Sequence, residues 1–253
     1  MKIKNIINII PLIVILIVWQ LMSLQSSKIS FLFSSPSKIL NTLWEKTING
    51  ELIKHTMITG YEALMGLLLG VFVGSFIGFT FLYYPKLAKL SKYYVLALSS
   101  IPIFALAPMM IIWFGIDLKM KIALAFFSTV FIAISQAYQG GQNIDKRELE
   151  FFKLNKATDK QKFWKLTLPS SIDWLIQSLK LNAGLAVLGA FIGEFIASDK
   201  GLGYVILKAS GLYDVSYVLA ATICIILLTL AFNYVAQLIE KNKLKIIRKI
   251  AIN

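Results

Sequence analysis

The chain has 253 residues, of which 57% are hydrophobic and only 15% are charged, and its mean hydropathy is +0.72. Soluble domains are about a quarter charged, so this composition excludes an ordinary soluble protein. The single Cys224 excludes a disulfide within the chain, and the single His55 leaves no cluster of soft metal ligands.

Six stretches are long and nearly free of charge. A helix that crosses the hydrocarbon core needs about 20 such residues, and lipid cannot satisfy backbone polar groups, so each stretch is predicted to be a transmembrane helix. The predicted spans are residues 6–24, 64–84, 93–116, 122–144, 174–197 and 215–239. They use most of residues 1–253, which are therefore predicted to form one all-α transmembrane domain.

The chain has a net charge of +13, and its basic residues are distributed unevenly between the two sides of the membrane in this topology. With the N-terminus inside, 17 basic residues fall on cytoplasmic segments and 8 on the other side. The cytoplasmic bases are Lys2 and Lys4, three lysines from 86 to 92, seven bases from 146 to 165 and five from 241 to 249. This asymmetry predicts that both termini are cytoplasmic, and it removes the reason to expect nucleic-acid binding. The N-terminal apolar run lacks a small-residue cleavage site and is predicted to be an uncleaved anchor.

After the first span, Ser35 and Pro36 form a helix-start signal, with serine as the N-cap and proline at the first helical position. Apolar residues then recur at helical spacing as far as Ile48, with charged residues between them. This pattern predicts a short amphipathic helix on the outer membrane interface that ends at Gly50.

Two spans carry glycines at four-residue spacing, which places them on one face of a helix. They are Gly66, Gly70, Gly74 and Gly78 in the second span, and Gly189 and Gly193 in the fifth. A face without side chains lets a neighbouring helix approach closely, so we expect helix-packing seams here rather than a substrate path.

The third span contains Pro102 and Pro108, with Ser99 and Ser100 just before them. Each proline frees a carbonyl and bends the helix, which is tolerated beside other helices or a water-filled cavity. These four residues are therefore candidates for a translocation path. The alternative is a bent helix that serves only in packing.

The fifth span contains two ionisable residues. Lys180, near the inner end, is expected to extend its ammonium group to the inner interface. Glu194, near the outer end, is a further candidate for the path, and the alternative places it at the outer headgroups. Residues 199–204 follow as a tight outer turn.

The segment 145–169, between the fourth and fifth spans, is charged and predicted to be helical and cytoplasmic. Its apolar side chains lie beside charged ones, as a helix that docks into a groove of another protein requires. The residues expected to carry this role are Glu150, Phe151, Phe152, Asn155, Lys156, Ala157, Phe163, Leu168 and Pro169. The alternative is that the aromatic residues rest at the inner membrane interface.

The sequence patterns of common catalytic sites do not occur in this chain. It contains no Gly-x-x-x-x-Gly-Lys-Ser/Thr, no His-Glu-x-x-His and no Gly-x-Ser-x-Gly. The chain is therefore not expected to be an enzyme or to hold a cofactor, and any ATP hydrolysis would need a partner subunit.

Taken together, the chain resembles the membrane-spanning permease subunit of bacterial ABC importers, in the branch that handles nitrate, sulfonates, taurine and related small molecules. Segment 145–169 is similar to the coupling loop of that family, the Glu-Ala-Ala (EAA) loop, and Phe163, Leu166, Leu168 and Pro169 match its closing residues. Residues 34–37, 50–52, His55 and Gly66 match the branch near its second span, and Glu194 with residues 201–204 matches it after the fifth. The similarity covers nearly the whole chain.

A few positions depart from the family pattern. Phe151 and Phe152 follow Glu150 where the family has two alanines, and Lys156 stands where it usually has glycine. Glycine would permit a left-handed turn, whereas lysine adopts one only at a steric penalty. Glu62 stands where the branch commonly has arginine. These changes bear on the geometry of the loop and on the identity of the partner.

The resemblance implies an ABC type I importer permease fold in a bacterial cell membrane, with a second permease copy, most simply in a homodimer. It also implies a cytoplasmic ATPase dimer that holds the loop and an extracytoplasmic binding protein that delivers the solute. Nucleotide binding would drive the permeases between inward-open and outward-open states. The expected solute is small and anionic, of the sulfonate, taurine, nitrate or vitamin-precursor type, and the sequence does not choose among these.

Two other functions are open from the sequence. A self-sufficient secondary transporter or channel would be favoured by coupling carboxylates within the membrane or by interrupted repeats, and the sequence offers only Glu194. A structural or assembly membrane protein would carry no solute at all.

Overall fold

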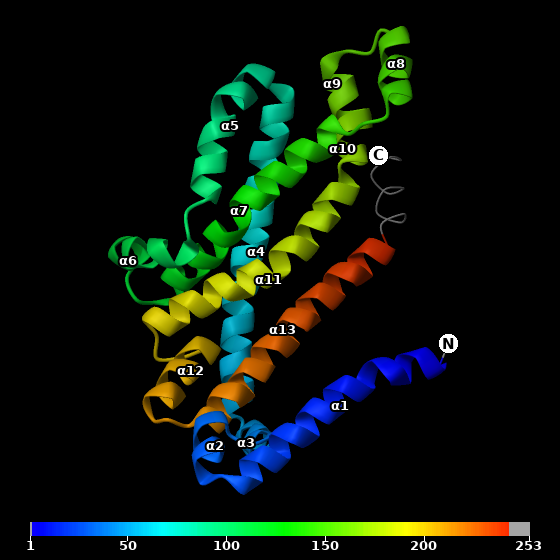
Figure 1. Ribbon diagram of the computed structural model, residues 1–253. Helices are drawn as coiled ribbons and strands as arrows, with labels where there is room; N and C mark the ends of the chain where they lie inside the picture. The colour runs from blue at the N-terminus through cyan, green and yellow to red at the C-terminus, as the bar shows by residue number, and fades with distance from the viewer. Residues whose placement is uncertain (1, 243–253) are drawn as a thin grey trace.

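A computed structural model describes residues 2–242, with the side chains of residues 10–171 and 174–242. Every regular element in this part of the chain is helical (Figure 1), as the all-α prediction requires. In chain order they are α1 (Lys2–Gln25), α2 (Ser27–Phe33), α3 (Pro36–Ile48), α4 (Glu51–Tyr83), α5 (Pro85–Ser99), α6 (Ile103–Phe114), α7 (Leu118–Gln142), α8 (Lys146–Leu154), α9 (Asp159–Lys162), a π-helical turn η1 (Phe163–Thr167), α10 (Leu168–Ser170), α11 (Ile172–Ile196), α12 (Leu202–Gly211) and α13 (Val215–Lys241). The side chains of the predicted cytoplasmic bases Lys2, Lys4 and 243–249 lie outside the described residues.

Helices α4, α7 and α11 pack together at the centre of the molecule (Figure 1). Their shared core consists of short side chains that are almost completely buried, namely Ala63, Leu67, Ala125, Ala186, Val187 and Ala190. Because lipid is as apolar as the helix surfaces, the hydrophobic effect does not drive these helices together, and close backbone approach with dispersion contacts must stabilise their association. Small side chains make that approach possible.

Both glycine stripes pack against α7. A Cβ added at Gly66 would lie 2.3 Å from the Cβ of Ala125, and one at Gly74 would lie 2.5 Å from the carbonyl oxygen of Val130. From α11, a Cβ added at Gly189 would lie 2.6 Å from the Cα of Ala125. The other stripe residues that meet α7 in this way are Gly70, Gly78 and Gly193. Helix α7 is therefore held between α4 and α11 at distances that leave no room for a side chain.

Within the described residues, four helices are long and apolar enough to cross a membrane: α4, α7, α11 from Trp174 onwards, and α13. The predicted span over 93–116 is not one kinked helix, because α5 and α6 meet at 94° around the break at 100–102. Pro102 has no N–H and restricts the residue before it, so α5 ends and α6 starts anew. Pro108 lies inside α6 without breaking it. Counting α5 and α6 as one crossing gives five, and the apolar part of α1, Ile10–Gln25, is a shorter helix.

The two ends of the bundle differ (Figure 1). One end carries α8, α9 and α10, and we call it the loop end; the other carries α2, α3 and α12, and we call it the α12 end. At the α12 end the predicted helix start is confirmed, because α3 begins at Pro36 and the Ser35 Oγ accepts a hydrogen bond from the Lys38 N–H at 3.3 Å. Gly50, in the left-handed conformation at φ +76°, separates α3 from α4.

Candidate functional site

The predicted coupling loop, residues 145–169, protrudes from the loop end as two short helices joined by a tight turn (Figure 1). The Asp145 carboxylate caps α8 by accepting the Arg147 N–H at 2.9 Å. At the other end of α8, the Asn155 amide donates to the Phe151 carbonyl at 2.8 Å, and the Ala157 N–H donates to the Phe152 carbonyl at 3.0 Å. These bonds satisfy helix-end groups that would otherwise lack partners.

Lys156 adopts the left-handed conformation, with φ +52°. This is the position where importer permeases usually have glycine, so the turn is kept although the residue that favours it is absent. The next helix, α9, begins directly after the turn with a reciprocal capping box between Thr158 and Gln161. Well-capped helices on both sides thus hold lysine in a strained backbone conformation.

The far side of the loop exposes apolar side chains. Phe151 is 62% exposed and Leu154 is 83% exposed, and the ring of Phe152 packs edge-on against that of Phe151 at 5.9 Å. Glu150 lies beside them, also exposed. An apolar patch with a charged neighbour on a protruding helix is the form of surface that a groove in a partner protein accommodates.

The near side of the loop is attached to the membrane bundle. The Phe163 ring makes edge-on contacts with Phe79 at 6.3 Å and with Tyr83 at 5.9 Å, both at the end of α4. Leu168 and Pro169 form α10, which leads into α11. The loop is therefore in direct contact with α4 and continuous with α11.

The five predicted path residues do not all lie together. Ser99 lines a cavity of about 550 Å³ between α5 and α7. Ser100 is exposed, with its hydroxyl donated to a backbone carbonyl within α5, and Pro102 and Pro108 belong to the break and to α6. Glu194, by contrast, is completely buried at the α12 end of α11. Its role in the path stays a prediction.

Glu194 belongs to a buried polar cluster. Its Oε1 accepts the Thr59 hydroxyl at 2.7 Å, and its Oε2 accepts the Gly203 N–H at 2.8 Å. The Thr59 Oγ1 in turn accepts the Leu202 N–H at 2.9 Å. These contacts bind the first residues of α12 to α4 and α11.

Two further charged residues complete this cluster, and sequence reasoning gave neither of them a role. Glu62 of α4 is 1% exposed and Lys121 of α7 is 5% exposed, and the Lys121 Nζ lies 3.6 Å from the Glu62 Oε1. Lys121 is one of the eight bases predicted to lie on the exterior side, because the predicted span begins at Ile122. Helix α7 begins at Leu118, so Lys121 is inside it. One feature of the sequence pointed to this pair: Glu62 is acidic where the branch commonly has arginine, so a basic partner could have been expected.

The surface of the α12 end is hollowed by a cavity of about 560 Å³ with a charged lining. Four lysines, Lys46, Lys54, Lys200 and Lys208, and three acidic residues, Glu51, Asp199 and Asp214, line it. A hydrogen bond from Lys46 to the Glu51 carboxylate, at 2.9 Å, raises the pKa of the lysine above its ordinary value. Lys46 and Lys200 are paired with Glu51 and Asp199, so the positive charge that an approaching anionic group would meet comes mainly from Lys54 and Lys208.

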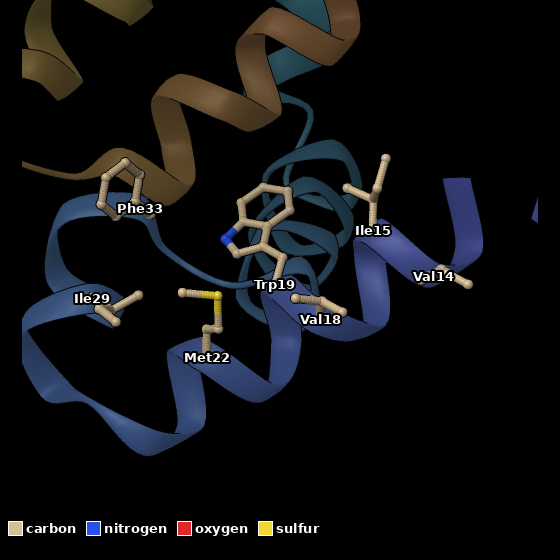
Figure 2. A pocket seen from close by; sticks show the side chains of 7 residues that line it. All are labelled: Val14, Ile15, Val18, Trp19, Met22, Ile29 and Phe33. Carbon is tan, nitrogen blue, oxygen red and sulfur yellow. The ribbon is translucent and has the colours of Figure 1, made fainter. Parts of the chain in front are cut away.

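A second cavity at this end, of about 510 Å³, is apolar. Figure 2 shows Trp19 and Met22 of α1 facing Ile29 and Phe33 of α2 across this space. A lining of this kind cannot orient a polar solute, and it suits lipid chains or another apolar helix.

Comparison with known proteins gives the chain its family. Residues 66–245 match the family described as "Binding-protein-dependent transport system inner membrane component". A protein of Haemophilus influenzae named as an ABC transporter permease is 26% identical over 92% of this chain and 95% of its own length. A Bacillus subtilis permease named for aliphatic sulfonates transport, SsuC, is 27% identical over 92% of this chain and 84% of its own.

The fold has a counterpart among solved structures. A chain of the MetNI methionine ABC transporter in an inward-facing conformation matches 78% of this chain and 93% of its own, with a TM-score of 0.60 and 18% identity. At that identity the match concerns the fold alone. Since the family match covers most of the chain, this protein belongs to the binding-protein-dependent transport system inner membrane components, the permeases of ABC importers.

Proposed function

We propose that this chain is the permease subunit of an ATP-driven importer that forms the path for a small, anionic solute delivered by an extracytoplasmic binding protein. The observation that carries the proposal is the coupling loop. It leaves Phe151 and Leu154 exposed on its far side and fixes Phe163 against α4 on its near side. With one surface free for an ATPase and another fixed to the membrane helices, the loop can transmit a movement of the ATPase to the bundle.

The loop surface supplies enough apolar area for docking. Burial of one phenylalanine or leucine side chain contributes about 1.5–3 kcal/mol, so burial of both residues offers several kcal/mol. Glu148 and Glu150 lie on the same helix and provide charged contacts around this apolar centre. Hot spots with an apolar centre and a charged rim are typical of protein interfaces.

The proposed topology has six crossings, with α1 as the first and α5 together with α6 as the third. The loop end is then cytoplasmic, as the basic residues of segment 145–169 favour. A second copy of the chain would cover the broken α5–α6 segment, which exposes Tyr93, Tyr94, Ile112 and Trp113 near the cavity that Ser99 lines. A cavity that mixes polar and apolar groups at such an interface suits a path for a small solute.

The solute class is supported by the relatives and by charge. SsuC is named for aliphatic sulfonates transport, and a relative from Chloroflexus aurantiacus, 28% identical, is named as a riboflavin transport system permease. In the cavity at the α12 end lysines outnumber acidic residues by four to three, and this small excess of positive charge favours an anion among these chemistries.

The test is purification of the tagged chain from its native membranes in mild detergent, with and without Phe151→Asp and Phe152→Asp. We expect a P-loop ATPase to be recovered in stoichiometric amount with the parent and to be lost from the double variant, which still inserts. The matched control is Leu212→Asp with Tyr213→Asp, because these residues are 71% and 73% exposed at the opposite end. The control should retain the ATPase.

Recovery of the ATPase with the Phe151→Asp, Phe152→Asp variant would refute the docking role of α8. Recovery of the chain alone, with solute flux in liposomes that needs no ATP, would support a secondary transporter instead. The observation that favours this alternative is the presence of two intramembrane carboxylates, Glu62 and Glu194, rather than one.

A further inference from the structure

We propose that Glu62, Lys121 and Glu194 form a latch that carries a single proton, held on Glu62, and that this latch fixes α12 to α4 and α11. The three side chains come from three different helices and meet at the α12 end of the central bundle. Their exposed fractions are 1%, 5% and 0%, so water does not screen their charges.

The charge count requires the proton. Two carboxylates and one ammonium group in a buried site leave one uncompensated negative charge if all three are ionised. An unpaired buried charge is strongly unfavourable, and one proton on either carboxyl group removes it. The resulting cluster holds one carboxylate, one carboxylic acid and one ammonium group, and it is neutral.

The hydrogen bonds assign the proton to Glu62. Both Glu194 oxygens accept hydrogen bonds, from the Thr59 hydroxyl and from the Gly203 N–H at the start of α12. Such donors stabilise an ionised carboxylate. Glu62 accepts no such hydrogen bond, because its Oε1 lies only at ion-pair distance, 3.6 Å, from the Lys121 Nζ and its Oε2 is buried without a partner. Thr59, which donates its hydroxyl to Glu194, lies one helical turn before Glu62 on α4, so the two carboxyl groups share one buried site.

The ionised Glu194 holds the turn before α12 in place. Three successive backbone N–H groups of this turn are bound, by the His55 Nδ1 at Gly201, by the Thr59 Oγ1 at Leu202 and by Glu194 at Gly203. A Cβ added at Gly201 would lie 2.1 Å from the Glu194 carboxyl carbon, so the turn rests directly on this group. Loss of the negative charge therefore releases α12.

The test uses the full chain in detergent with Cys224→Ser and a reporter, Val205→Cys. Val205 is 2% exposed in α12, so maleimide labels it only when the helix separates from the bundle. We expect Glu62→Gln, which imitates the protonated acid, to label at the parent rate within about twofold. Glu194→Gln and Lys121→Met should label at least about tenfold faster, because each leaves a buried charge or donor unpaired.

The matched control is Lys180→Met, which removes a lysine that pairs with Glu240 at the loop end and should leave labelling unchanged. Labelling of the Glu62→Gln protein as fast as that of Glu194→Gln would overturn the assignment of the proton. Labelling of Lys121→Met at the parent rate would overturn the latch. If Glu194→Gln fails to accumulate, the labelling rate of Glu62→Gln is compared with that of the parent, and a rate at least about tenfold faster would overturn the assignment of the proton. Failure of Glu62→Gln itself to accumulate would also contradict the proposal.

Discussion

The seam between α4 and α7 makes a quantitative prediction for Gly66→Ala. The new Cβ would lie 2.3 Å from the Cβ of Ala125 and 2.9 Å from both the carbonyl carbon of Ala125 and the backbone nitrogen of Phe126. Carbon atoms pack at about 3.5–4.0 Å, so the two helices must separate by more than about 1 Å. Backbone atoms cannot rotate away, which places the cost near the upper end of the usual ~1–3 kcal/mol for overpacking.

Alanine also gains up to about 1 kcal/mol over glycine in a helix, so the net loss is about 1–2 kcal/mol. At about 2–4 °C for each kcal/mol, the midpoint of thermal unfolding in detergent should fall by several degrees. The matched control is Gly184→Ala in α11, whose Cβ would meet only the Thr229 methyl group at 3.6 Å. It should unfold at or above the parent midpoint. Equal unfolding midpoints for Gly66→Ala and Gly184→Ala would refute the close contact between α4 and α7 at Gly66.

Two further predictions concern the coupling loop. Lys156→Gly should slow amide hydrogen exchange in α8 and α9 by up to about fivefold, because glycine adopts the left-handed conformation without the strain of about 1 kcal/mol that lysine bears. Lys156→Ala keeps this strain and should leave the exchange rates unchanged. Phe163→Ala removes the contacts with Phe79 and Tyr83, so trypsin should cut the loop several-fold faster. Phe151→Ala, which removes an exposed ring, should leave the cutting rate unchanged, and equal rates for the two variants would contradict the attachment through Phe163.

The sequence predicted those features that depend on neighbouring residues. Ser35 and Pro36 mark the start of α3 because capping and the fixed φ of proline act within one helical turn. The stripe from Gly66 to Gly78 could be placed on one face because helical period alone determines it. Its partner could not be named, since nothing in the stripe specifies α7.

Features that depend on contacts between distant segments were beyond the sequence. Pro102 predicts a bend, but the 94° between α5 and α6 depends on how both pack against the bundle. Lys121 was placed outside the membrane because a charge ends a hydrophobic window, whereas inside the bundle it meets a polar partner, Glu62, on another helix. The pairing of these residues becomes visible only once α4 and α7 are side by side.

Helix α4 connects the predicted coupling loop with the proposed latch. Its 33 residues span about 50 Å, with Glu62 and Thr59 in the latch toward one end and Tyr83 against the coupling loop at the other. Sliding of α4 along α7 would drive backbone atoms into one another at each glycine of the stripe, so we infer that the pair moves as a rigid body. A displacement at the loop would then reach the latch undiminished. If larger, flexible side chains filled the contact between α4 and α7, their rearrangement would reduce the displacement before it reached the latch.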